Sequence, residues 1–428
     1  MPSTTAPVPS PARRWLLAAG VVAIVAGAGV VGNDLFVGDF QAPLDYTAFW
    51  TAGRLNAEGQ NPYDAALVRQ IQRELGWETT AIMMWNPPWT LGFVMPLGLL
   101  PFRTGHGIGI LLNLGLVLLS AEWLRRGFGM RGGRRIAAML ALAFVPTFFL
   151  VGSGQITGIA LLGLAGFLTA SRAGRPWLAG AVGAATAVKP HLLGLFALWL
   201  LIDALRSGRG RRVVLAGSVA LLVASVPPTL ANPDVWTQYL AAITGGPSTD
   251  HHELAHWEPP LAGWWFRSAI PGAPFAVQFL PFALAAVGFA AWCWRTKPDR
   301  TETTGDRLPW IVGLSLLAAP YGVWQYDFVL LLVPILATAA RLAARPTAAG
   351  VVAGIGWLAI LNGVSLAMML HHAEPKWYFW FTPAVLLGCA AVRRVNASDW
   401  RWVPKRTRAD AIWHDSGPQT AKPCCSRW

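Results

Sequence analysis

Charged residues are scarce in this chain. They make up 13% of its 428 residues, whereas soluble domains carry about 25%. A share this low, in a chain this long, excludes a disordered protein, a fibrous protein and an ordinary cytosolic enzyme. Hydrophobic residues make up 54%, in long runs that are typical of a protein in a lipid bilayer. The 23 Trp and 32 Pro agree, since Trp gathers at membrane interfaces and Pro is tolerated in spanning helices.

Cysteine is also rare, with four residues, and none has the spacing of a metal site or of a disulfide framework. Cys293 and Cys389 lie in apolar runs, and Cys424 and Cys425 lie in a polar tail. The segment His251–His256 is rich in histidine, but it lacks the His-Glu-x-x-His motif. We therefore expect no functional metal, with a metal at this segment as the alternative.

The net charge of +13 does not indicate nucleic-acid binding, because no basic domain is present. The Lys and Arg residues stand in short clusters between apolar runs, which is typical of cytoplasmic loops. The clusters are Arg125–Arg135, Arg172–Arg175, Arg206–Arg212, Arg295–Arg300, Arg341–Arg345 and Arg393–Arg394.

The N-terminal segment, residues 1–14, ends with Arg13 and Arg14, which precede the apolar run Trp15–Gly32. A bilayer crossing needs about 20 residues, so the run predicts an uncleaved anchor that begins in the cytoplasm. A cleaved signal peptide is the alternative, although its apolar region should be only about 7–15 residues long.

The charge pattern predicts an all-α integral membrane protein. We expect a polytopic helical bundle over residues 15–395, with about 12 transmembrane helices and both termini in the cytoplasm. Two large outer loops, about 33–87 and 231–272, should interrupt the bundle, and residues 396–428 should form a cytoplasmic tail.

The first outer loop should hold two short amphipathic helices, Tyr46–Ala57 and Asp64–Leu75, with Asp64 as a helix cap. The following stretch, Pro88–Trp123, could cross once or twice. Two crossings would place the Arg125–Arg135 cluster outside, against the positive-inside rule, so we favour a short dip before one helix.

Polar residues that cytoplasmic loops do not explain gather at the outer ends of the apolar runs. They are Asp45, Gln155, Lys189, His191, Asp234, His251, His252, Glu253, His256, Asp327, His371, His372 and Glu374. Ionisable groups at membrane depth are costly and usually functional. Positions at hinges and helix ends favour an enzyme pocket that opens outward. A transporter or flippase of lipid-linked saccharides, with binding residues near the midplane, is the alternative.

Two of these residues have the sharpest local context. Lys189 precedes Pro190, which cannot continue the helical hydrogen bonds, so Lys189 and His191 should lie at a helix break. A lysine that extends to the interface is the alternative. Asp45 precedes the aromatic segment Tyr46–Trp50, which should lie against the bilayer surface and hold the carboxylate over the first span. A helix N-cap is the alternative for Asp45.

Several motifs, weak alone, have a specific order and spacing together. They are Asp45–Arg54 with Gly59 and Pro62–Asp64, Trp85–Trp89, Gly154–Gln155, Arg175–Gly180 with Lys189–His191, and Ala319–Tyr321 with Tyr326–Asp327. In this order they resemble glycosyltransferase family 87. Ile156 stands where that family commonly has Asn.

The resemblance implies the type C membrane glycosyltransferase fold. It also implies an activity similar to that of the α-mannosyltransferases that use polyprenyl-phosphate mannose on the outer face of the cell membrane. The partners would be a polyprenyl-phosphate sugar donor, a lipid or glycan acceptor and the bilayer, with no cofactor. The lack of a nucleotide-binding motif agrees with a lipid-linked donor. A non-catalytic assembly partner is a third interpretation, against which intact Asp45 and Lys189 argue.

The resemblance also implies roles for individual residues. Asp45 would be the general base, and Lys189, with His191, would stabilise the leaving phosphate. The other residues implied to bind substrate are Gln155, Tyr321, Tyr326 and Asp327. A single displacement would invert the anomeric carbon.

Overall fold

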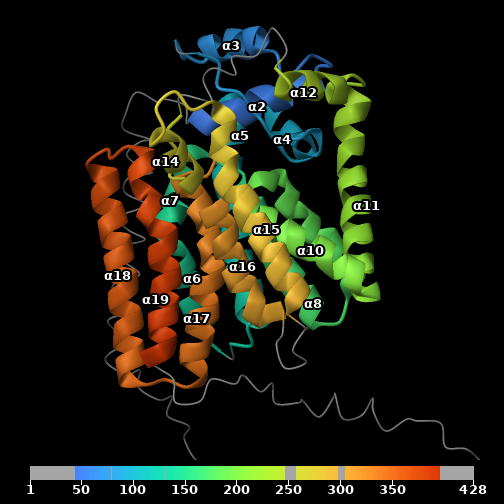
Figure 1. Ribbon diagram of the computed structural model, residues 1–428. Coiled ribbons are helices and arrows are strands. Elements are labelled where there is room, and N and C mark those ends of the chain that lie inside the picture. The colour runs from blue at the N-terminus through green and yellow to red at the C-terminus, as the bar shows by residue number, and fades with distance from the viewer. Residues whose placement is uncertain (1–43, 79, 131, 246–256, 297–303, 396–428) are drawn as a thin grey trace, which may run out of the picture. The chain divides into compact units, whose positions relative to one another are not determined.

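The computed structural model describes residues 44–78, 80–130, 132–245, 257–296 and 304–395. Every regular element in these ranges is a helix (Figure 1), which confirms the all-α fold class. The predicted anchor Trp15–Gly32, the histidine-rich segment His251–His256 and the tail 396–428 lie outside the described residues.

The first half of the chain alternates long helices with short helical turns. Its elements are α2 (Leu44–Ala57), α3 (Ala65–Glu74), η1 (Pro88–Thr90), α4 (Leu91–Gly98), α5 (Phe102–Gly127), α6 (Arg134–Leu142), α7 (Val145–Ser153), α8 (Thr157–Arg172), α9 (Pro176–Gly183), η2 (Ala184–Val188), η3 (Pro190–Leu193) and α10 (Gly194–Arg206).

The second half continues in the same way. Its elements are α11 (Gly208–Ala231), α12 (Val235–Ile243), α14 (Ala262–Ser268), η4 (Phe275–Phe279), α15 (Leu280–Arg295), α16 (Thr304–Ala318), η5 (Gln325–Leu331), α17 (Leu332–Ala344), α18 (Ala348–Leu370), η6 (Pro375–Trp380) and α19 (Phe381–Val395).

Five helical segments are long and apolar enough to cross a bilayer. They are Phe102–Gly127, Gly208–Ala231, Phe275–Arg295, Gln325–Ala344 and Ala348–Leu370. The pair α6 and α7, bent by 61°, would make a sixth. The chain is therefore a multi-pass membrane protein. The expected number of about 12 crossings depends on helices shorter than a bilayer normally requires, and it stays a prediction.

The stretch Pro88–Trp123 contains one candidate span. Helix α4 has 8 residues and, at about 1.5 Å per residue, is far too short to cross a bilayer of about 30 Å. Helix α5 has 26 residues and is long and apolar enough to cross by itself. The preferred interpretation, a short dip followed by one helix, agrees with this geometry.

Helices α2 and α3 stand where the sequence predicts them, but only α3 has the expected exposed face. The Asp64 carboxylate caps α3 by accepting from the N–H groups of Ala66 and Leu67, at 2.8 and 3.2 Å. By contrast, residues 46–53 of α2 are buried on all sides. Helix α2 packs against α4 and α5 and does not offer an aromatic face to a bilayer surface, because its Trp, Phe and Tyr rings fill the protein interior.

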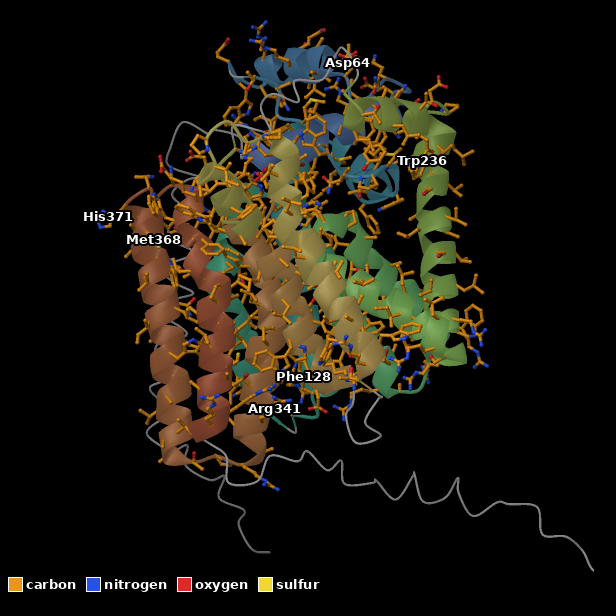
Figure 2. The ribbon with its side chains drawn as sticks, in the orientation of Figure 1. Asp64, Phe128, Trp236, Arg341, Met368 and His371 are labelled. Carbon is orange, nitrogen blue, oxygen red and sulfur yellow. The ribbon has the colours of Figure 1, made fainter. Side chains whose placement is uncertain are left out.

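The arginine clusters at the ends of α5 and α17 lie at the end of the bundle opposite the first-loop helices α2 and α3. Figure 2 places Asp64 and His371 toward one end, and Phe128 and Arg341 toward the other. Helices α2, α3 and α12 lie at the first end (Figure 1). The arginine clusters that begin in the last turns of α5 and α17 both lie at the second, on one shared side as the sequence predicts for them.

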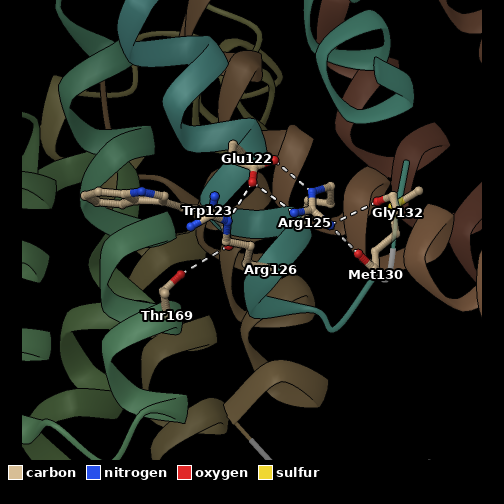
Figure 3. Close-up of polar contacts among 7 residues, drawn as sticks. All are labelled: Glu122, Trp123, Arg125, Arg126, Met130, Gly132 and Thr169. Carbon is tan, nitrogen blue, oxygen red and sulfur yellow. Dashed lines mark hydrogen bonds and ion pairs between the residues drawn. The ribbon is translucent and has the colours of Figure 1, made fainter. Parts of the chain in front are cut away.

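The basic end also has a structural role. The Arg125 guanidinium forms an ion pair with Glu122, with N–O distances of 2.7 and 2.9 Å. It also donates to the carbonyl groups of Met130 and Gly132, at 2.5 and 2.9 Å (Figure 3). Arg125 therefore closes the turn after α5 in addition to supplying charge.

Candidate active site

A cavity of about 750 Å³ opens among the helix ends that share the α2 and α12 end of the bundle. The residues that line it come from α2, the segment before η1, the α7–α8 hinge, the η2–η3 break, α12 and the two residues after it, Trp257, η4 and the segment Tyr321–Tyr326. Six of the seven predicted site residues reach its wall: Asp45, Gln155, Lys189, His191, Tyr321 and Tyr326. Segments distant in sequence thus meet at one site.

Backbone breaks bring these side chains into the cavity. Helix α7 ends at Gly154, whose φ of 68° is the left-handed conformation that glycine adopts easily, and Gln155 follows. Pro190 separates η2 from η3 and leaves Lys189 between them. Gly322, with a φ of 59°, turns the chain between α16 and η5.

The central interaction is a buried ion pair between Lys189 and Asp327. The Nζ atom of Lys189 lies 2.8 Å from Oδ1 of Asp327, and the two side chains are 6% and 0% exposed. Burying both charges away from water costs free energy unless the other hydrogen-bonding atoms of the two groups also have partners. Two further donors meet this need: Thr157 Oγ1 donates to Oδ1, and the Trp324 N–H donates to Oδ2 at 3.0 Å.

Asp327 therefore lies behind Lys189 and is not one of the residues that line the cavity. Its carboxylate is occupied by three protein donors, from α8, from the Lys189 break and from its own helical turn. Its role in this geometry is to neutralise and orient Lys189, whose ammonium also lies 4.6 Å from the centroid of the Tyr326 ring.

The backbone just before Lys189 is clamped by the Trp85–Trp89 motif. Asn86 Nδ2 donates to the carbonyl of Val188 at 2.6 Å, and Trp89 Nε1 donates to that of Ala187 at 2.8 Å. These carbonyls come from the turn that Pro190 prevents from continuing as a helix, so they have no regular helical partner. The clamp satisfies them and holds the break open toward the cavity.

Asp45 lies in the first turn of α2 and projects toward Gln155 of the α7–α8 hinge. The side chain of Gln155 forms hydrogen bonds with Asp45 and with Tyr326. Since a carboxylate can only accept, the Gln155 amide N–H donates to Asp45. Gln155 thus links the carboxylate to the tyrosine that faces Lys189.

The surroundings make Asp45 a stronger base than a solvated aspartate. Burial raises the pKa of its carboxyl to about 6, while the Lys189 charge and the Gln155 hydrogen bond oppose that rise. A carboxylate with a pKa near neutrality is well suited to accept a proton in a reaction.

His191 does not supply a second positive charge. Burial and the nearby Lys189 ammonium lower the pKa of the imidazole to about 3, so His191 is neutral at physiological pH. Its ring packs edge to face on Tyr321, with centroids 5.5 Å apart. Among the described residues that line the cavity, Lys189 is therefore the positively charged side chain.

No group of three or more His, Cys, Asp or Glu side chains able to hold a metal occurs among the residues that the structure describes. The histidine-rich segment lies outside them, so both interpretations of that segment stay open.

Sequence reasoning missed the residues that support the site. Asn86 stands out only as a polar residue between Trp85 and Pro87, and Thr157 only as a hydroxyl at the end of the predicted hinge. Trp257 and Trp324 line the cavity but resemble the many other interfacial tryptophans of this chain. Their roles depend on contacts between distant segments.

One protein-family model matches the chain, that of glycosyltransferase family 87, over residues 85–320. The match spans the Asn86 clamp, Gln155, Lys189 and His191, while Asp45 and Tyr326 lie outside it. None of the curated proteins and none of the solved structures matches the chain.

Removing one partner of the buried ion pair should destabilise the protein strongly. Lys189→Met or Asp327→Asn should each lower the free energy of unfolding by about 3–5 kcal/mol, because each leaves a buried charge without its partner. The double variant Lys189→Met/Asp327→Asn should lose less free energy of unfolding than the two single variants lose together, by at least about 1 kcal/mol. Denaturant or thermal unfolding of the purified protein measures this coupling.

The matched control is Glu58→Gln, which breaks the Arg54–Glu58 pair, in which both side chains are 44% exposed. It should cost less than about 1 kcal/mol, because solvent screens that pair. Additive losses at Lys189 and Asp327 would show that the two charges do not depend on each other.

Proposed function

Because the chain belongs to glycosyltransferase family 87, and is therefore a glycosyltransferase, we propose the following reaction. It transfers mannose from a polyprenyl-phosphate sugar to a lipid or glycan acceptor on the outer face of the cell membrane. The observation that carries the proposal is the convergence of a carboxylate with a raised pKa, Asp45, and a buried cation, Lys189, on one cavity.

The proposed step is a single displacement. Asp45 accepts the proton of an acceptor hydroxyl while the oxygen attacks C1 of the donor sugar. The bond between C1 and the phosphate oxygen breaks, its electron pair leaves with the polyprenyl phosphate, and the configuration at C1 inverts. The products are the glycosylated acceptor and polyprenyl phosphate, and the proton on Asp45 then leaves to solvent.

Lys189 is suited to the phosphate because its charge is already oriented. One ammonium N–H bonds Asp327, so others remain for the phosphate oxygens. Charge develops on those oxygens as C1 departs, and a fixed cation in a site shielded from water stabilises it without reorganising. Asp327 and Thr157 hold the ammonium in place during that change.

The cavity has an apolar wall that fits a lipid-linked donor. Tyr239 and Ile243 of α12 face it from one segment, and Phe275 and Phe279 of η4 from another. Ile243 and Phe279 are 44% and 39% exposed, so apolar surface continues outward from the cavity. A polyprenyl chain can follow that surface while its phosphate reaches Lys189, which a nucleotide-sugar donor would not require.

The outer face is supported by the position of the arginine clusters in the bundle. The cavity lies at the end that holds the acidic first loop, opposite the arginine clusters. Under the positive-inside rule the arginines face the cytoplasm and the cavity faces outward.

Replacement of the base and of the cation should have separable effects. Asp45→Asn keeps the shape and the Gln155 contact but cannot take a proton, so kcat should fall by about 10²-fold or more with little change in donor KM. Lys189→Met should lower kcat by about 10²-fold and also raise donor KM, since phosphate is present in ground and transition states. Steady-state transfer by purified protein, with radiolabelled polyprenyl-phosphate mannose, measures both.

Each variant must first keep the wild-type elution profile in detergent, so that loss of fold is not mistaken for loss of chemistry. Near-normal turnover by folded Asp45→Asn would reject Asp45 as the base.

The rate of transfer should depend on pH through Asp45. Its carboxyl is the active base when ionised, so kcat/KM should be constant above about pH 7 and fall about tenfold per unit below pH 6. His191 cannot cause this inflection, because its pKa is about 3. In Lys189→Met the inflection should move to higher pH, since Lys189 lowers the Asp45 pKa. A profile that is flat from pH 5 to pH 8 would contradict the assignment.

A further inference from the structure

Four aromatic rings form a cluster on the cavity wall. This cluster includes neither the proposed base, Asp45, nor the cation, Lys189. Trp257 and Tyr321 lie nearly parallel, with centroids 6.4 Å apart and an angle of 19° between their planes. Trp324 meets Trp257 at 70° and 5.7 Å, and His191 meets Tyr321 at 65° and 5.5 Å. All four line the cavity and none is fully buried, so the cluster is open to a ligand.

The chemistry of this cluster differs from that of the apolar wall. A pyranose ring has one face of C–H groups and a rim of hydroxyl groups. Aromatic faces carry partial negative charge and attract such C–H groups, while the ring edges and nearby polar atoms can meet the hydroxyls. His191 is neutral, and one of its ring nitrogens already bonds the Gly322 backbone, so the other remains for a hydroxyl without a charge that would favour phosphate there.

The position of Trp257 is held by an ion pair outside the cavity. The next residue, Glu258, accepts from Nζ of Lys376 at 2.6 Å, and Lys376 also pairs with Glu374 at 2.8 Å. The Lys376 side chain is 17% exposed, although it belongs to the turn between α18 and α19. Lys376 also lies over the rings of Trp264 and Trp377, at 5.8 and 5.7 Å. The Glu258–Lys376 ion pair thereby fixes the segment that contains Trp257 against the turn between α18 and α19.

We propose that Trp257, Tyr321 and Trp324 form a sugar platform that stacks on a pyranose ring in the cavity, and that the Glu258–Lys376 pair positions it. The proposal rests on the proposed function and deepens it, because it assigns the binding of a saccharide ring to residues distinct from the base and the cation. The ring belongs either to the donor or to the acceptor, and separate KM values for the two substrates distinguish these sources.

The test compares Trp257→Leu with Trp257→Phe in purified protein. Trp257→Leu removes the aromatic face and should raise the KM of one substrate by about three- to tenfold, with a smaller change in kcat. Trp257→Phe keeps an aromatic face and should stay within about twofold of wild type. A rise in donor KM assigns the platform to the donor sugar, and a rise in acceptor KM assigns it to the acceptor.

Lys376 provides the second arm, because it is not among the residues that line the cavity and its contact with the Trp257 segment is the ion pair with Glu258. Lys376→Met should raise the same KM as Trp257→Leu and leave the other unchanged. The matched control is Glu374→Gln, which removes the second partner of Lys376, 59% exposed, and leaves the Glu258 contact intact. It should behave as wild type.

Wild-type transfer combined with unchanged KM values in Trp257→Leu would overturn the platform and leave the proposed function standing. A loss of kcat alone in Trp257→Leu would overturn it too, since stacking acts on binding. Absence of transfer by the wild-type protein would instead reject the proposed function, and the platform with it.

Discussion

The buried contact between Lys189 and Asp327 is the constraint on which the rest of the site depends. An ammonium and a carboxylate are stable in this interior only when both are bonded, and Thr157, Trp324 and the Tyr326 ring complete their surroundings. The pair joins the η2–η3 break to η5, across 138 residues of sequence. It thereby supplies a fixed positive charge next to the Asp45 carboxylate, in a cavity lined mostly by aromatic and aliphatic side chains.

Much of this arrangement could be predicted from local chemistry. The scarcity of charge and the long apolar runs indicated an all-helical membrane protein. Pro190 after Lys189 indicated a break with a cation at its tip, because proline cannot continue the hydrogen bonds of the preceding turn. Asp64 before an amphipathic segment indicated a helix cap, and the structure shows that cap. The family resemblance at Lys189–His191 also agrees with the family to which the chain belongs.

The remainder depends on contacts that local patterns do not contain. The partner of Lys189 is Asp327, which the sequence presents only as another polar residue at a hinge. The family resemblance implies that Asp327 binds substrate, and no local pattern identifies it as the partner of Lys189. The burial of α2 between α4 and α5 reverses the expected bilayer contact of its aromatic face, since aromatic residues suit a membrane surface and a protein core equally well. The Asn86 clamp on Val188 likewise joins segments 102 residues apart.

The stereochemistry of transfer tests the central claim most directly, namely that one base and one fixed cation perform a single displacement. Purified protein is supplied with a β-linked polyprenyl-phosphate mannose and an acceptor, and the new glycosidic bond is examined by nuclear magnetic resonance. A single displacement with Asp45 as base predicts an α-linked product. A β-linked product would mean that the configuration is retained, by two displacements or by attack on the face that the phosphate leaves, and it would contradict this account of the site.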